Sequence, residues 1–439
     1  MVEPGSLEKA LESHWGYHAF RPLQERAIRS ILGARDCAVV MPTGGGKSLC
    51  YQLPAVILGG TAIVISPLIA LMQDQVLQLR EMNISAAFLN STLDRQEQSR
   101  VMSEAVKGAF RLIYLSPERL ANPDTIAWLR RLQVSFFAID EAHCISEWGH
   151  EFRPEYRQLF ALREQFPDKP IAAFTASATQ RVRHDILGQL GLRDAEKLIV
   201  SFKRPNLRFT VKKCANEEVQ RDFLQAALAE HGGSAAIVYA PTIRRVMEIA
   251  EWLEQSGVPS IPYHGQMESS IRKTNQERWM SGERPVMVGT LAFGLGINKA
   301  SVRTVIHLSL PKSIEQYYQE AGRAGRDGLP SDCLLLWQYR DVALLAHFIQ
   351  ACTDPEERER SWQRYHRVRR FAESAVCRQR QICEHFGEKP KWERCGQCDI
   401  CLGEPAWLKA VAPRAATPRG RRRTSSRSGF RRGVPPGPR

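Results

Sequence analysis

The stretch MPTGGGKS, residues 41–48, carries residue types that bind phosphate. Its first three residues are the end of an apolar run, CAVVMPT (37–43), that predicts a buried strand. A glycine-rich turn after a strand exposes backbone N–H groups, and the next helix adds its dipole. We therefore expect Lys47 to reach the β- and γ-phosphates of a nucleotide and Ser48 to hold Mg²⁺. The other residues expected in this loop are Thr43, Gly44, Gly45 and Gly46.

The second candidate motif is DEAH, residues 140–143, at the end of the apolar run VSFFAID (134–140). Adjacent carboxylates at a strand tip are suited to metal binding and to base catalysis. Asp140 is the expected Mg²⁺ ligand, and Glu141 is expected to orient and activate the attacking water. Acidic turns are common, so DEAH indicates a nucleotide-hydrolysing site only together with the glycine-rich loop upstream.

A third motif, QEAGRAGRDG at residues 319–328, begins with Gln319. Arg323 and Arg326 are three residues apart, so on a helix they share one face. Arginines directed at a γ-phosphate from a second domain act as arginine fingers. A solvated basic turn is the alternative, and the complete nucleotide motif upstream makes it less favoured. We expect all three residues to be catalytic.

The elements that must position these motifs are unbroken apolar runs separated by helical patterns. Such runs predict strands buried on both faces, as in parallel sheets, and indicate two α/β domains of similar build joined near residues 201–209. In the first domain the expected strands are 37–43, 61–67, 111–117, 134–140 and 171–177, with a helix at 68–82. In the second they are 234–241, 260–264, 284–290, 302–310 and 333–339, with a helix at 244–257.

Composition excludes several classes of protein. The 439 residues are 43% hydrophobic and 25% charged, contain no apolar run long enough to span a bilayer, and begin without a signal-peptide pattern. We therefore expect an intracellular protein whose 11 cysteines are thiols and metal ligands. The net charge is +14, and residues 404–439 hold ten basic residues and one acid, which gives +9 of that total. This segment predicts a disordered tail that binds a polyanion, with a merely solubilising tail as the alternative.

The segment CISEWGHEFRPEY, residues 144–156, joins the DEAH motif to aromatic residues. Trp148 and Phe152 offer faces for base stacking, and Arg153 offers a phosphate or cation–π contact. His150 is a further expected DNA contact, and with His143 it could relay DNA binding to hydrolysis. Packing of these aromatics into a core is the alternative.

These motifs together resemble the RecQ family of superfamily 2 DNA helicases, in its bacterial type, over residues 7 to about 403. The resemblance implies two RecA-like domains, ATP-driven 3′-to-5′ unwinding of DNA, and adenine recognition by Gln24 with Tyr17 and Arg21 around the base. It also implies contacts to DNA phosphates from residues 66–75 and 114–120. The stretches that carry the likeness are 15–24, 66–75, 114–120, 175–179, 288–303 and 319–326.

Three cysteines, Cys395, Cys398 and Cys401, have the spacing of a metal knuckle but leave a tetrahedral site one ligand short. Cys377, Cys383 and His385 lie upstream. Placed on one helix, the first two would point about 240° apart, so both cannot face one metal. The resemblance selects Cys377 and implies a structural Cys₄ zinc site. It leaves Cys383 for core packing.

The expected fold is α/β: two RecA-like parallel-sheet motor domains, then a small helical Cys₄ zinc-binding subdomain and a disordered basic tail. The expected boundaries are 1–204 with a core at about 28–196, then 205–352, 353–403 and 404–439. Family members often continue into a winged helix and a helical DNA-binding domain, and we expect this chain to be a short form without them. Strong unwinding is then in doubt, and the hypothesis is that the arginine-rich tail partly substitutes by binding the DNA backbone.

The expected function is ATP-dependent DNA strand separation in repair or recombination, with ATP, Mg²⁺ and Zn²⁺ as cofactors. The expected partners are single-stranded, forked or overhang DNA, with a single-stranded-DNA-binding protein as a candidate. We expect a monomer in the cytoplasm, associated with the nucleoid and not with a membrane. The alternatives are a DNA-stimulated ATPase that unwinds weakly and mainly remodels or anneals DNA, an RNA helicase, and a non-enzymatic scaffold.

Overall fold

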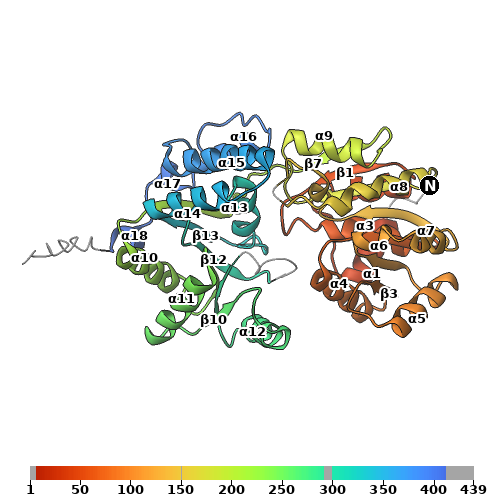
Figure 1. Ribbon diagram of the computed structural model, residues 1–439, viewed down its shortest axis with the longest axis horizontal. Helices are drawn as coiled ribbons and strands as arrows, with labels where there is room; N and C mark the ends of the chain where they lie inside the picture. Colours follow the sequence, from red (N-terminus) through yellow and green to blue (C-terminus); the bar gives the residue numbers. More distant parts are fainter. Residues whose placement is uncertain (1–5, 150, 291–298, 412–439) are drawn as a thin grey trace, which may run out of the picture.

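The computed structural model describes residues 6–149, 151–290 and 299–411. Two parallel sheets, each covered by helices, follow one another along the chain and lie side by side in Figure 1. The first domain is drawn in red to yellow, and the second in green to blue. Among the described residues, no helix has the length and apolar character that crossing a bilayer requires.

The first sheet has the strand order β3-β4-β2-β5-β6-β1-β7. Its strands are β1 (Cys37–Val40), β2 (Thr61–Ile65), β3 (Ala86–Leu89), β4 (Leu112–Leu115), β5 (Val134–Ile139), β6 (Ile171–Thr175) and β7 (Glu196–Ile199). All pairings are parallel, as the unbroken apolar runs predict. The carboxyl ends of β1 and β5 therefore meet at one edge of the sheet, where the glycine-rich loop and DEAH begin.

The covering elements of the first domain are mostly α-helices, with two 3-10 segments after DEAH. They are α1 (Ser6–Trp15), α2 (Gln24–Leu32), α3 (Lys47–Ile57), α4 (Ile69–Glu81), α5 (Arg95–Val106), α6 (Pro117–Leu120), α7 (Pro123–Leu129), η1 (Ala142–Ile145), η2 (Pro154–Leu159), α8 (Phe160–Gln165) and α9 (Gln180–Gln189).

The second sheet has the order β10-β11-β9-β12-β13-β8, which repeats that of six strands of the first sheet, β3-β4-β2-β5-β6-β1. Its strands are β8 (Leu207–Lys213), β9 (Ala235–Tyr239), β10 (Ser260–Tyr263), β11 (Val286–Gly289), β12 (Val302–His307) and β13 (Ser331–Trp337). The helices along this part of the chain are α10 (Glu217–Glu230), α11 (Ile243–Gln255), α12 (Ser269–Ser281) and α13 (Ile314–Ala321). Five predicted strands in each domain are confirmed, while β3, β7 and β8 are additional.

A helical region follows the second sheet. It contains α14 (Tyr339–Gln350), α15 (Pro355–Glu373), α16 (Arg378–His385), α17 (Asp399–Leu402) and α18 (Ala406–Lys409). In Figure 1, α15 and α16 lie at the top of the second domain, and α16 contacts α13. The helical zinc-binding region is thus confirmed as a part of the fold, whereas the domain boundaries stay a prediction.

One prediction at the carboxyl end is wrong. Residues 404–411 do not begin a disordered tail, because α18 packs its buried Leu408 against α10. Glu404 accepts a hydrogen bond at 2.5 Å from Lys212 of β8. An apolar pair, Trp407 and Leu408, in the short arginine-free stretch 404–413 was the sequence signal for this contact. Residues 412–439, which hold the arginines of the predicted tail, lie outside the described residues.

Candidate functional site

The glycine-rich loop joins β1 to α3, and its glycines allow two close approaches. Gly44 and Gly46 have φ values of 79° and 80°, which glycine adopts without strain. A Cβ on Gly44 would lie 2.8 Å from Cγ of Arg326, and one on Gly46 would collide with Nε2 of Gln24. Lys47 is the first residue of α3, so the loop ends on a helix N-terminus that favours phosphate. Of the other predicted loop residues, Thr43 and Gly45 lie in this turn, and Ser48 is the second residue of α3.

The residues expected around the adenine contact this loop directly. Gln24 donates from Nε2 to the carbonyls of Gly45 and Gly46 at 3.3 and 3.1 Å, and its Oε1 accepts from the backbone of Arg21 at 2.8 Å. The Arg21 guanidinium donates to the carbonyl of Gly44. Tyr17 is 57% exposed, which leaves its ring open for stacking. In this conformation, Gln24 braces the phosphate loop.

The two carboxylates follow β5 at the same sheet edge. The backbone of Asp140 donates to Ile65 of β2 at 2.8 Å, and its carbonyl accepts from Tyr156 at 2.9 Å. Burial and the charge of Glu141 raise the pKa of Asp140, while Lys47 opposes the rise. A cation placed beside Asp140 would favour its charged form, so the acid fits a Mg²⁺ ligand.

Glu141 has a left-handed backbone, with φ of 47°. For a residue with a side chain this conformation costs about 1 kcal/mol or more and is typical of functional sites. Its carboxylate lies 3.2 Å from Nδ1 of His143, and that nitrogen also lies 3.0 Å from the hydroxyl of Thr175. The predicted base is therefore connected to the end of β6.

The second domain contributes two of its three predicted residues at this edge. Gln319 of α13 donates to the hydroxyl of Ser177 at 3.0 Å, and Arg326 lies against Gly44. Burial, then the charges of Arg323 and Arg204, lower the pKa of Arg326 to about 9. A bound anion would relieve this crowding of positive charge, which fits a site for phosphate.

Arg204, in the segment between the domains, was missed by the sequence reasoning. It donates from NH1 to the carbonyls of Thr43 and Gly322, at 3.3 and 3.4 Å, and from NH2 to Ala324 at 3.3 Å. One side chain thus bridges the phosphate loop and the arginine motif. The available signal was an arginine placed before a proline at the predicted joint.

The aromatic segment packs against neighbouring helices. The Arg181 guanidinium lies 3.1 Å from the ring centroid of Trp148, and that of Arg360 lies 5.6 Å from it. Phe152 lies 5.1 Å from the Arg157 guanidinium. The Arg153 side chain donates to the carbonyl of Pro67 at 3.2 Å. Their roles as DNA contacts stay predictions. His150 and residues 291–298 of the resembling stretch 288–303 lie outside the described residues.

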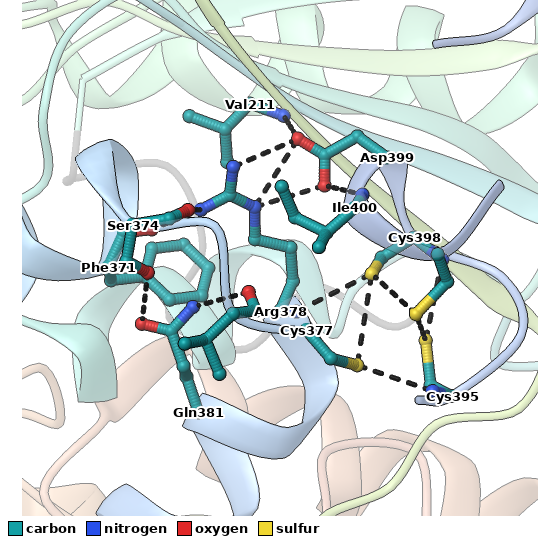
Figure 2. Close-up of polar contacts among 12 residues, drawn as sticks. Val211, Phe371, Ser374, Cys377, Arg378, Gln381, Cys395, Cys398, Asp399 and Ile400 are labelled. Atoms are coloured by element: carbon teal, nitrogen blue, oxygen red, sulfur yellow. Dashed lines mark hydrogen bonds and ion pairs between the residues drawn. The ribbon is translucent and has the colours of Figure 1, made fainter. Parts of the chain in front are cut away.

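Four thiols come together at the carboxyl end of the fold, as predicted. Figure 2 shows three of them, Cys377, Cys395 and Cys398, pointing toward one another. Sγ of Cys398 lies 3.8 Å from that of Cys377 and 3.5 Å from that of Cys401, which in turn lies 3.8 Å from Cys395. A tetrahedral Zn–S₄ centre with bonds of about 2.3 Å places its sulfurs about 3.8 Å apart. The four cysteines therefore fit zinc.

Two further observations concern this cluster. Backbone N–H groups donate to sulfur from Arg378, Cys395 and Cys398, at 3.4, 3.3 and 3.4 Å, which favours thiolates. Cys377 is the residue before α16 and not within a helix, because the backbone turns there to direct its sulfur at the knuckle. Cys383, assigned to packing, is fully buried in the core.

A buried ion pair connects the cluster to the second sheet. Arg378 and Asp399 contact at 3.0 Å, and Asp399 also accepts from the backbone of Val211 in β8 at 3.1 Å (Figure 2). Since the two residues flank Cys377 and Cys398, zinc binding would fix both partners of the pair. The zinc site thereby holds the helical region on the second domain.

Three family models match successive parts of the chain: DEAD/DEAH box helicase over residues 21–186, helicase conserved C-terminal domain over 219–328, and RecQ zinc-binding over 339–402. The chain is 42% identical over 405 residues to the ATP-dependent DNA helicase RecQ of Haemophilus influenzae, covering 92% of this chain and 65% of that protein. It is also 42% identical over 396 residues to the protein of the same name in Bacillus subtilis, covering 90% and 66%.

Among solved structures, the fold is similar to that of S. cerevisiae Dbp5 bound to RNA and ADP BeF3. The TM-score is 0.61 at 17% identity, over 80% of this chain and 91% of that one. The Mycobacterium smegmatis helicase Lhr bound to ssDNA and AMP-PNP gives a TM-score of 0.61 at 20% identity, over 79% and 49%.

Two RecA-like domains that share one nucleotide-binding edge form the core of superfamily 2 helicases, and the observed fold is of this class. With the RecQ zinc-binding match and the two bacterial relatives, the chain belongs to the RecQ family. It spans slightly less than two-thirds of the length of those two relatives.

Proposed function

We propose that the chain is an ATP-driven motor that moves 3′-to-5′ along single-stranded DNA and separates DNA strands. The observation that carries this proposal is the shared edge, where Arg326 of the second domain lies against Gly44 of the first. A site divided between two domains changes when the domains separate, so its occupation can be converted into movement.

The side chains would divide the work as follows. The loop amides and Lys47 bind and orient the phosphates of ATP, and Glu141 holds the attacking water and accepts its proton. Arg323 and Arg326 stabilise the negative charge that develops on the phosphoryl group. Gln319 holds the second domain against the first through its hydrogen bond to Ser177. Mg²⁺, held by Ser48 and Asp140, supplies charge neutralisation when it is bound.

DNA is the proposed substrate because the relatives that resemble the chain over most of its length carry the name DNA helicase. Contacts to a phosphate backbone would give little sequence preference and a strong dependence on salt. We also propose a role in DNA repair or recombination, a location in the cytoplasm on the nucleoid, action as a monomer, and contact with a single-stranded-DNA-binding protein.

The decisive experiment compares ATP hydrolysis with single-stranded DNA, with RNA of the same sequence and with no nucleic acid, then strand separation on forked and overhang duplexes. We expect stimulation by DNA and separation only with a 3′ single-stranded arm. Equal stimulation by RNA would favour an RNA helicase. DNA-stimulated hydrolysis without strand separation would favour a protein that remodels or anneals DNA.

The arginine-rich segment has its own test. We propose that residues 412–439 bind the DNA backbone, given that they hold nine arginines and no acidic residue. Deleting 412–439, and not 404–439, leaves α18 in place. The deletion should weaken DNA binding and flatten its salt dependence. An unchanged affinity and salt slope would contradict this role.

A further inference from the structure

A second cluster of metal-binding side chains lies directly behind the DEAH carboxylates. It consists of His143, Cys144 and Glu151, whose ligand atoms all lie within 4.8 Å of one another. Nε2 of His143 lies 3.8 Å from Sγ of Cys144 and 3.9 Å from Oε2 of Glu151. The histidine and the cysteine are buried, whereas Glu151 is partly exposed and opens the cluster to solvent.

The orientation of the His143 ring is an independent observation that points to a cation. Its Nδ1 faces the Glu141 carboxylate at 3.2 Å and the Thr175 hydroxyl at 3.0 Å. Histidines that bind metals commonly donate one ring N–H to a carboxylate, which fixes the tautomer and directs the other nitrogen at the metal. His143 has this arrangement, with Nε2 directed at Cys144 and Glu151.

We propose that His143, Cys144 and Glu151 form an inhibitory site for a thiophilic divalent cation, with Zn²⁺ as the occupant. Sulfur, imidazole and carboxylate are the donors that zinc takes, and a water would complete the tetrahedron. Bonds of about 2.0 to 2.3 Å require donor separations of about 3.3 to 3.6 Å. The two distances from Nε2 of His143 exceed these by a few tenths of an ångström, which movement of the partly exposed Glu151 can supply. The thiol proton of Cys144 is released to solvent on binding.

The consequence follows from where the ligands sit. Cys144 and Glu151 belong to the aromatic segment 144–156, while His143 contacts the predicted base Glu141. A cation bonded to all three fixes the segment in its present position beside the carboxylates. DNA bound to the aromatic residues then cannot alter the hydrolytic site. This consequence rests on the proposed function, because it requires hydrolysis that DNA stimulates.

Binding is tested first, without DNA or ATP. Equilibrium dialysis against Zn²⁺ should find two zinc ions per chain in the intact protein, one of them in the four-cysteine site. Cys144→Ser and Glu151→Gln should each retain one. Glu155→Gln, in the same segment, and Cys352→Ser, a more accessible thiol, are matched controls that should retain two. One zinc ion in the intact protein, or two in both site variants, overturns the proposal.

Activity is tested next with the zinc-loaded protein. Added Zn²⁺ should lower the DNA-stimulated ATPase rate to the DNA-independent rate, a chelator weaker than the four-cysteine site should restore it, and Glu151→Gln should resist inhibition at least tenfold. Equal inhibition of Glu151→Gln and Glu155→Gln would contradict the proposal. Absence of DNA stimulation before zinc is added would instead contradict the proposed function, while dialysis would still decide whether the site exists.

Discussion

Six strands follow the same order in both sheets, yet the loops after the equivalent strands β1 and β8 carry opposite charge. β1 lies next to β6 in the first sheet, and β8 lies next to β13 at the equivalent position of the second. After β1 come the glycines and Lys47, while after β8 come Asn216 and the acidic start of α10. Asn216 accepts from the backbone of Val219 at 2.9 Å, so its own side chain fills the helix N-terminus that would receive phosphate.

The difference teaches how two similar folds make one site. Glu217, in the first turn of α10, accepts hydrogen bonds from Arg245 at 2.9 Å and also from Arg340, so a carboxylate already pairs with the arginines beside this helix start. The second domain instead brings Gln319 and Arg326 to the edge of the first. Topology therefore provides two equivalent places, and from the local sequence we expect only the first of them to take nucleotide.

The largest expected effect comes from removing the contribution of the second domain. Replacing Arg323 and Arg326 together with alanine should lower kcat for ATP hydrolysis by roughly 10³-fold or more, since arginine fingers contribute on that order. Nucleotide binding, measured with a fluorescent ATP analogue, should change far less. Arg244→Ala, an exposed arginine of α11, is the control. A double variant that hydrolyses ATP normally would show that the second domain does not complete the site.

Replacing Lys47 with alanine tests the first domain. We expect a loss in kcat of roughly 10²- to 10³-fold, the usual cost of one donor to developing charge. Unlike the arginine variant, this one should also bind nucleotide more weakly. Lys107→Ala, at an exposed position of the same domain, should behave as the wild type. Full strand separation by Lys47→Ala would contradict an ATP-driven motor.

The parts of the fold that could be predicted are those whose sequence pattern lies within one strand or directly after it. β1 and β5 are short unbroken apolar runs, so their burial on both faces can be read from the sequence. β7 could not, because its pattern is mostly exposed along an edge of the sheet. The glycine-rich loop and DEAH follow their strands directly, and hence their meeting at one sheet edge was predictable.

Contacts between distant segments could not be predicted. The bonds from Arg204 to both domains, and the stacking of Arg181 on Trp148, depend on helices and loops that only the tertiary fold brings together. The resemblance assigned Gln24 to adenine, but the sequence could not indicate that its amide also braces the glycine loop. Cys395, Cys398 and Cys401 were predictable because ligand spacing is a local property. The upstream ligand, Cys377, was selected only by the resemblance.

A smaller effect should separate helix capping from nucleotide binding. Asn216→Ala removes the cap of α10 and should destabilise the second domain by about 1 kcal/mol, while the ATPase rate at saturating DNA stays unchanged. Thr179→Ala is the matched control, since Thr179 caps α9 in the first domain. Urea denaturation and ATPase assays check both outcomes. A lost ATPase activity in folded Asn216→Ala would indicate that α10 also serves the nucleotide.

The last expected effect is on stability at one range of pH and concerns a buried acid of the second domain. Burial raises the pKa of Asp341, in the first turn of α14, from 3.8 to about 6. The folded state therefore binds its proton more tightly than the unfolded state, and the stability from Asp341 is lost as the pH rises from about 4 to 6. Asp341→Asn keeps an acceptor for the backbone of Gln338, which donates to Asp341 at 2.7 Å.

The variant should thus gain stability relative to the wild type across this pH window, by no more than about 1.4 kcal/mol per pH unit. Urea midpoints of both proteins at about pH 4, 5, 6 and 7 measure this difference, in which other titrating groups cancel. A difference that stays constant with pH would contradict the raised pKa. If hydrolysis is also unchanged, this buried carboxyl group affects stability alone, whereas Asp140 in the first domain is expected to serve the cation.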